Sequence, residues 1–272
     1  MSPPSSERQR TSAPIYELLY YPGIPGRGEF IRLVFEATGT QYTDVANDDP
    51  PSGSRSNGYG VLQKALSPDI TRDEFGNPPV FAPPMLRIVG AAKDGKPLLI
   101  HQTPNILLYL GEKLGVGGSD EAERLWINQL ALTALDLNNE CHDTHHPVAV
   151  MEYYEDQKDE ALKKATDFRK NRIPKFFSYF ERTLRGNQEG GGEYLISNKL
   201  SYADTTLWQV IDGLKFAFPK EMEARKADYP LLFGTFYRAV KERTGIKAYL
   251  ESDRRLKYSN GVFRHYPELD RQ

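Results

Sequence analysis

Cysteine is nearly absent from this chain of 272 residues, in which Cys141 is the only one. A single thiol excludes an internal disulfide framework and any zinc site that needs two or more thiolates. Long apolar runs are also missing, since no stretch approaches the roughly 18 residues of a membrane-spanning helix. The opening residues lack the apolar segment of a secretory signal.

An excess of one charge is missing as well, because 35 Lys and Arg residues stand against 37 Asp and Glu residues. Proteins that bind nucleic acids or anionic membranes need clustered positive charge. We therefore predict a cytoplasmic protein with no nucleic-acid and no membrane partner. Aromatic residues, in contrast, are plentiful: 16 Tyr and 13 Phe exclude a disordered chain and supply a core for one or two domains.

The order of the apolar patterns divides the chain into two parts. Residues 1–14 are aperiodic and predict a flexible tail. Residues 15–115 predict a β-α-β unit followed by a β-β-α unit, joined by an irregular excursion over 46–80 with one short helix near 61–66. Thr103 is the expected N-cap of the last helix of this part, and Pro104 its first residue.

Patterns typical of strands nearly disappear after residue 118, so we predict that residues 119–272 form an all-helical domain. Pro147 and Pro174 are expected to break or kink its helices. Ser201 and Asp204 have the spacing of a capping box and are assigned a structural role. The expected helices cover Asp120–His142, Glu152–Arg172, Lys175–Arg185, Ser201–Phe216, Pro230–Arg243 and Ile246–Glu251.

Four segments of this sequence together resemble the cytosolic glutathione transferases of the tyrosine type. They are Tyr16–Pro22 with Gly26–Arg32, Phe81–Leu86, Asp94–Leu110 and Tyr194–Asp204. The resemblance spans roughly residues 15–250. It implies an α/β thioredoxin-like N-terminal domain with a mixed four-stranded sheet, an all-α C-terminal domain and a homodimer. It also implies a transferase that uses glutathione as co-substrate, with no metal.

The chemistry of that family requires a glutathione thiolate near neutral pH. Lowering the pKa of a thiol from about 8.5 to 7 takes about 2 kcal/mol, and one hydrogen bond to a charged acceptor supplies about 1.5–3 kcal/mol. By resemblance, Tyr20 is the catalytic phenol. Alternation along the strand places Tyr20 and Tyr21 on opposite faces, so only one can face the substrate. Tyr21, or a purely packing role for Tyr20, stays open.

The resemblance also assigns the residues that hold glutathione. Gln102 and Thr103 correspond to the family's pair at the γ-glutamyl carboxylate, where a helix start offers free N–H groups. Pro84 corresponds to the cis-proline, with Met85 beside it, and Arg27 reaches either the tripeptide or the domain interface. Here Pro83 precedes the cis-proline and has no N–H to donate.

Three further residues are candidates for the ends of the tripeptide. Asp136 stands where some family members place a carboxylate that reaches the partner subunit's glutathione, although a solvated aspartate is the simpler interpretation. Lys64 and Arg72 are candidates for the glycine carboxylate of glutathione.

Two polar runs are interpreted without a ligand. Cys141–His146 matches no familiar zinc spacing and predicts the polar end of a helix, with no metal and no catalytic thiol. Arg254 and Arg255 with Lys257 predict a solvated surface. The resemblance thus implies a transferase that conjugates glutathione to a small hydrophobic electrophile. One alternative is a non-catalytic binding or regulatory protein of the same fold, which Pro83 and the 46–80 excursion favour. Another is a glutathione-dependent isomerase or biosynthetic enzyme.

Overall fold

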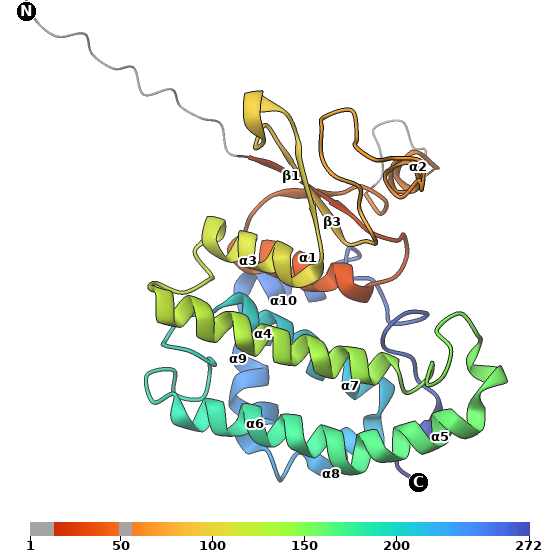
Figure 1. Ribbon diagram of the computed structural model, residues 1–272. Helices are drawn as coiled ribbons and strands as arrows, with labels where there is room; N and C mark the ends of the chain where they lie inside the picture. Colours follow the sequence, from red (N-terminus) through yellow and green to blue (C-terminus); the bar gives the residue numbers. More distant parts are fainter. Residues whose placement is uncertain (1–13, 49–55) are drawn as a thin grey trace, which may run out of the picture.

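The computed structural model describes residues 14–48 and 56–272, which form a sheet-containing N-terminal domain and a helical C-terminal domain (Figure 1). Residues 1–13 of the predicted tail and Pro50–Pro51 of the predicted excursion lie outside the described residues. Within the described ranges, no helix combines the length and hydropathy that crossing a membrane requires.

The N-terminal domain is built on a mixed four-stranded sheet in the order β2-β1-β3-β4. β1 pairs parallel with β2, whereas β1 with β3 and β3 with β4 are antiparallel. A parallel pair needs a crossover, which α1 supplies. This confirms the predicted sheet. The strands are β1 Ile15–Leu19, β2 Tyr42–Asp44, β3 Met85–Val89 and β4 Leu98–His101.

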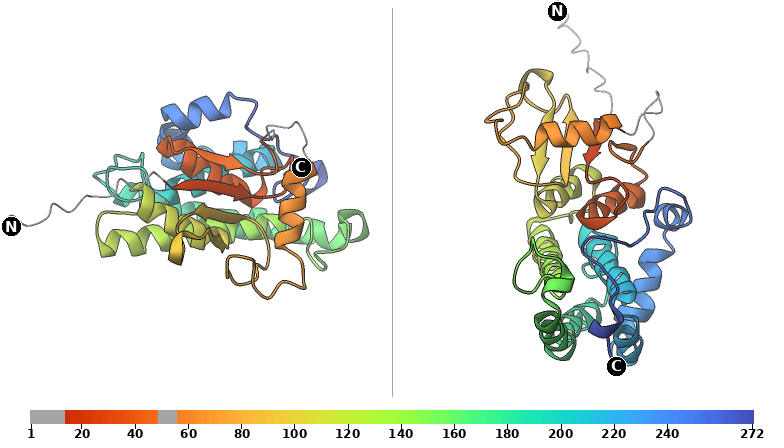
Figure 2. Two further views of the ribbon diagram at one scale, coloured as in Figure 1. Left: turned by 90° about the horizontal axis from the view of Figure 1, so that it is seen from above. Right: turned by 90° about the vertical axis from the view of Figure 1, so that its right-hand side faces the viewer.

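Helices cover both faces of this sheet because neighbouring strand residues point to opposite sides. Leu18 packs with residues of α1 (Glu29–Thr38) and α3 (Thr103–Leu114) in the main core, whereas Leu19 and Met85 pack with Leu62 of α2 (Ser56–Ala65). α1 and α3 lie between the sheet and the helical domain (Figure 2).

Several predicted boundaries hold and others shift. α1 ends where expected, at Gly39, whose φ of 65° closes the helix. β1 stops at Leu19, so Tyr20 and Tyr21 follow the strand instead of ending it. The short helix expected near 61–66 is the longer α2. The N-cap of α3 is Gln102 and not Thr103, because Gln102 leaves the helical conformation while its carbonyl already accepts the Ile106 N–H.

The helical domain is organised around α7, which is buried along most of its length and packs against α4. Its capping box is confirmed: the Asp204 carboxylate accepts from the Ser201 N–H and hydroxyl at 2.7 Å each, and from the Leu195 N–H at 2.8 Å. The helices are α4 Glu121–His142, α5 Lys158–Asp167, α6 Ile173–Gly186, α7 Tyr202–Ala217, α8 Pro219–Arg225, α9 Tyr237–Lys241 and α10 Thr244–Leu250. The sequence pattern did not predict α8.

Pro174, where a break or kink is expected, follows an irregular turn but does not end the helical path. A π-helical turn at Phe168–Arg172 joins α5 to α6, and Pro174 lies in the first turn of α6. A proline inside a helix removes one backbone hydrogen bond, and helices accommodate it where the regular pattern is interrupted, as in a π-helical turn. The turn therefore absorbs the proline and leaves one long helical segment (Figure 1).

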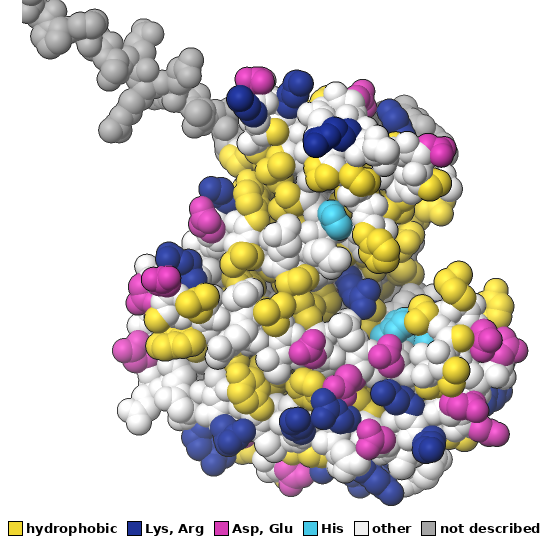
Figure 3. Space-filling view, in the orientation of Figure 1, with side chains coloured by type: hydrophobic (Ala, Val, Ile, Leu, Met, Phe, Trp, Pro, Cys, Tyr) yellow, Lys and Arg dark blue, Asp and Glu magenta, His cyan; other side chains and the backbone are white. Residues whose placement is uncertain are grey.

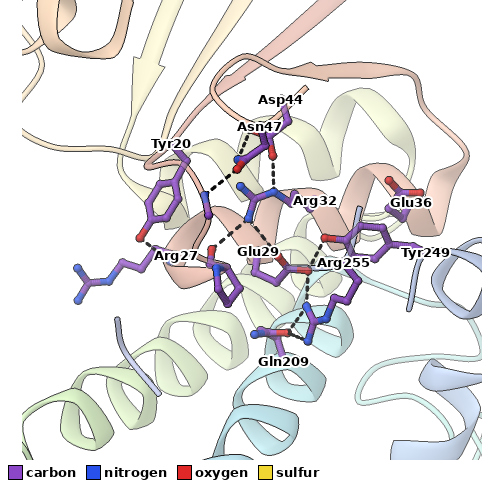
Figure 4. A network of polar contacts seen from close by, with 12 residues as sticks. Tyr20, Arg27, Glu29, Arg32, Glu36, Asp44, Asn47, Gln209, Tyr249 and Arg255 are labelled. Carbon is purple, nitrogen blue, oxygen red and sulfur yellow. Dashed lines mark hydrogen bonds and ion pairs between the residues drawn. The ribbon is translucent and has the colours of Figure 1, made fainter. Parts of the chain in front are cut away.

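A buried ion network joins the two domains. The Glu29 carboxylate of α1 is fully buried and accepts from the Arg32 guanidinium at 3.0 Å, from the Tyr249 hydroxyl at 2.8 Å and from the Arg255 guanidinium (Figure 4). Arg32 also donates to Asp44 at 2.6 Å. The expectation of a solvated surface is wrong for Arg255, whose side chain is 11% exposed, because it neutralises a carboxylate 226 residues earlier in the chain.

Candidate functional site

One cavity of about 340 Å³ brings together five of the residues that the sequence singles out, namely Arg27, Pro84, Gln102, Thr103 and Asp136. The first four belong to the N-terminal domain and Asp136 to α4. The face shown in Figure 3 is hollowed between the two domains. The cavity is also lined by Phe81, Ala82, Pro83, Pro104, Leu132, Leu135 and Asn139.

The start of α3 forms the polar wall of the cavity. Gln102 has a φ of 72°, which turns the chain sharply out of β4 into the helix. Thr103 is 4% exposed, and its Oγ1 has no hydrogen-bond partner among the described residues. A helix start also carries unpaired N–H groups and the positive end of the helix dipole. This wall can therefore accept a carboxylate.

The loop before β3 forms a second wall. The Pro83–Pro84 peptide bond is cis, as the resemblance implies. Met85 does not line the cavity: its side chain is buried, and its backbone lies in β3 between Leu19 and His101. Met85 can therefore offer only its backbone to a ligand.

Tyr20 lies directly behind the cavity and does not line it. Its ring packs on Gly26 and Gly28, where an added Cβ would stand 2.2 Å from its hydroxyl and 2.7 Å from its Cγ, respectively. The hydroxyl accepts the backbone N–H of Arg27 at 2.9 Å (Figure 4). Burial raises the pKa of Tyr20 despite the opposing effect of Arg27. The phenol is thus neutral near pH 7, and within the described residues no hydrogen bond uses its proton. Tyr21 is 39% exposed.

Arg27 connects this wall to the helical domain. Its Nη2 donates to Asn139 Oδ1 of α4 at 2.8 Å. Asn139 was not among the predicted site residues, although it stands three residues after Asp136 and so on the same helix face. Leu132 and Leu135 add an apolar surface on α4.

Lys64 and Arg72 do not reach this cavity. Both line a separate cavity of about 400 Å³ on the α2 side of the sheet. Lys64 pairs with Glu74 at 3.4 Å, and Arg72 donates to the Gly76 carbonyl at 2.8 Å. The structure therefore does not bring these two candidates together with Gln102 and Thr103.

Comparison with known proteins gives consistent similarities. Residues 142–253 match the family described as "Glutathione S-transferase, C-terminal domain". "Glutathione S-transferase P 1" of Xenopus laevis is 29% identical over 244 residues, which cover 90% of this chain and 95% of that protein.

Solved structures share the fold. The Pi-class glutathione S-transferase of Onchocerca volvulus has a TM-score of 0.59 at 24% identity and covers 87% of this chain and 92% of its own. Prostaglandin synthase D of Nilaparvata lugens has a TM-score of 0.61 at 21% identity and covers 88% of this chain and 98% of its own.

Proposed function

Because the chain is a divergent member of the cytosolic glutathione S-transferase family, we propose that it conjugates the thiolate of glutathione to a small hydrophobic electrophile. The observation that carries this proposal is the single cavity shared by Arg27, Pro84, Gln102, Thr103 and Asp136. These residues lie far apart in the sequence, and one tripeptide can contact them together.

The γ-glutamyl end of glutathione occupies the start of α3. Its carboxylate accepts from the first N–H groups of the helix and from the Thr103 hydroxyl, which has no partner among the described residues. The backbone at Pro84 and Met85 lies beside the cysteinyl residue. Pro83 offers only its carbonyl there.

The Tyr20 hydroxyl keeps its proton and donates a hydrogen bond that stabilises the thiolate, while the proton of the thiol passes to solvent. The hydroxyl already accepts from Arg27, and such a bond strengthens the same hydroxyl as a donor. Because Tyr20 does not line the cavity, the Arg27 segment has to move for the sulfur to reach the phenol. The electrophile lies against Leu132 and Leu135 of α4, with Asn139 at its polar edge.

A homodimer in the cytoplasm is part of this proposal. Apolar side chains are exposed in the loop before β3 and along the first half of α4, where Phe81 is 84% and Leu125 62% exposed. Such surfaces commonly mark protein contacts. Light scattering on the purified chain tests the dimer, and a mass of 30.9 kDa would contradict it.

Two alternatives have specific support. The missing donor at Pro83 favours a binding protein without turnover. The shared fold of a prostaglandin synthase favours an isomerase that uses glutathione transiently, with the same thiolate.

The experiment measures how fast wild type, Tyr20→Phe and the control Tyr21→Phe conjugate glutathione to a chlorinated nitrobenzene. Loss of about 2 kcal/mol of thiolate stabilisation predicts a fall in kcat/KM of about 30-fold for Tyr20→Phe. The pKa read from the pH–rate profile should also rise in this variant, because the bound thiol loses its donor. Tyr21→Phe should match wild type.

Equal rates for wild type and Tyr20→Phe would remove Tyr20 from the mechanism. Glutathione uptake in calorimetry without turnover of any electrophile would favour the binding protein. Absence of glutathione uptake would overturn the proposal.

A further inference from the structure

Three imidazoles meet where α4 ends. His142 is the last residue of α4, and His145 and His146 lie in the turn that follows. Each of the three offers one nitrogen within 4.8 Å of the other two. Their ring centroids stand 5.0–5.2 Å apart. The sequence spacing gave no sign of this cluster, because the turn and not the helix period brings the rings together.

Each ring also has one nitrogen within hydrogen-bond distance of an oxygen acceptor. His142 Nδ1 lies 3.2 Å from Asp143 Oδ1, His145 Nε2 lies 3.3 Å from the Gly261 carbonyl, and His146 Nδ1 lies 3.1 Å from the Glu152 carbonyl. A carbonyl or carboxylate beside one ring nitrogen fixes the N–H there and leaves a lone pair on the other. Histidines that bind metals almost always have this outer partner.

The position of the cluster suits an ion that keeps one contact with solvent. His145 is 1% exposed, whereas the His142 side chain is 23% exposed. Histidine surface is visible at the lower edge of the hollow between the domains (Figure 3). Nearby charges oppose one another: the Asp143 carboxylate favours a cation, and Arg264 disfavours it but is turned to the Gly261 carbonyl, to which its Nε donates at 3.1 Å.

We propose that His142, His145 and His146 bind one divalent transition-metal ion of the zinc class, with water as the fourth ligand. Three neutral imidazoles with an open position form a common ligand set for zinc. In a tetrahedral site with bonds of about 2.0–2.1 Å the ligand nitrogens stand about 3.4 Å apart, so the rings close slightly on the ion. The bound ion ties the end of α4 to the segments around Glu152 and Gly261.

The experiment titrates Zn²⁺ into the full chain, prepared without a polyhistidine tag, by calorimetry. The variants are His142→Gln and His146→Gln, both at partly exposed positions, and the control is His265→Gln, which keeps the cluster intact. We expect one Zn²⁺ per chain in wild type and the control. Each cluster variant should lose about tenfold or more in affinity.

A second readout separates the cluster from incidental binding. Zn²⁺ should raise the melting temperature of wild type and of His265→Gln but not of the double variant His142→Gln/His146→Gln, because a ligand that binds only the folded state stabilises it. Circular dichroism shows whether each variant is folded. Zn²⁺ uptake that survives in the folded double variant, or no uptake by wild type, would overturn the proposal.

Discussion

Replacing Arg255 by methionine tests the ion network that joins the domains. Methionine keeps much of the volume of arginine but removes the charge, so the buried Glu29 carboxylate loses one of its two cationic partners. Removing one partner of a buried pair costs about 3–5 kcal/mol. Glu29 keeps Arg32 and the Tyr249 hydroxyl, and we therefore expect a loss at the lower end, about 3 kcal/mol.

The neighbouring residue offers a matched control. Arg254 pairs with Glu36 but its side chain is 54% exposed, so Arg254→Met should cost about 1 kcal/mol or less. Urea unfolding followed by circular dichroism measures both variants against wild type. Equal losses for the two variants would refute the assignment of Arg255 to a buried, stabilising network.

The contribution of Glu29 to the stability of the fold should depend on pH. Burial alone would raise the pKa of Glu29, but Arg255, Arg32 and Tyr249 together hold it below the ordinary value of 4.5. A lowered pKa stabilises the fold above pH 4.5 and loses this contribution as the pH falls through the folded-state pKa. The difference in free energy of unfolding between wild type and Arg255→Met should therefore become smaller at acidic pH. A difference in free energy of unfolding that grows below pH 4.5 would contradict this account.

Three further substitutions test the site and the core. Thr103→Val removes a hydroxyl that has no partner in residues 14–48 and 56–272, so the free energy of unfolding should hold or rise by about 1 kcal/mol while the KM for glutathione rises. An unchanged KM would remove Thr103 from the binding wall. Ser201→Ala should cost about 1 kcal/mol in urea unfolding, because it removes half of the capping box of α7; no loss would show that Asp204 alone suffices. Gly28→Ala places a Cβ 2.7 Å from the Tyr20 ring and should lower kcat/KM. Its control is Gly60→Ala, where no atom of the described part of the chain lies within 4 Å of the added Cβ, and this variant should keep the kcat/KM of wild type.

The sequence predicts most of the fold because its elements carry local signals. α1 shows an apolar stripe closed by a glycine, and α7 begins at a capping box, so both are found nearly as they stand. α8 follows directly on α7 and has only seven residues, which leaves its pattern too short to distinguish. Pro174 marks an irregular turn and not the end of a helix, since the π-helical turn before it leads directly into α6.

Some residues of the candidate site can likewise be predicted from the local sequence, and others cannot. Gln102 and Thr103 lie at a helix start and can be found from the local pattern. Asn139 and the partners of Arg255 depend on how the two domains meet, which no local pattern encodes. The histidine cluster likewise depends on a turn that closes only against the segment around Gly261.

The distance along the chain between Glu29 and Arg255 has a consequence for synthesis. The N-terminal domain leaves the ribosome first, yet its buried carboxylate, already paired with Arg32, lacks its second cationic partner until 226 more residues have been added. Domains often fold as separate units during translation. Here we expect the first domain to stay loosely held until the C-terminal helices arrive, so that both domains reach their final packing together.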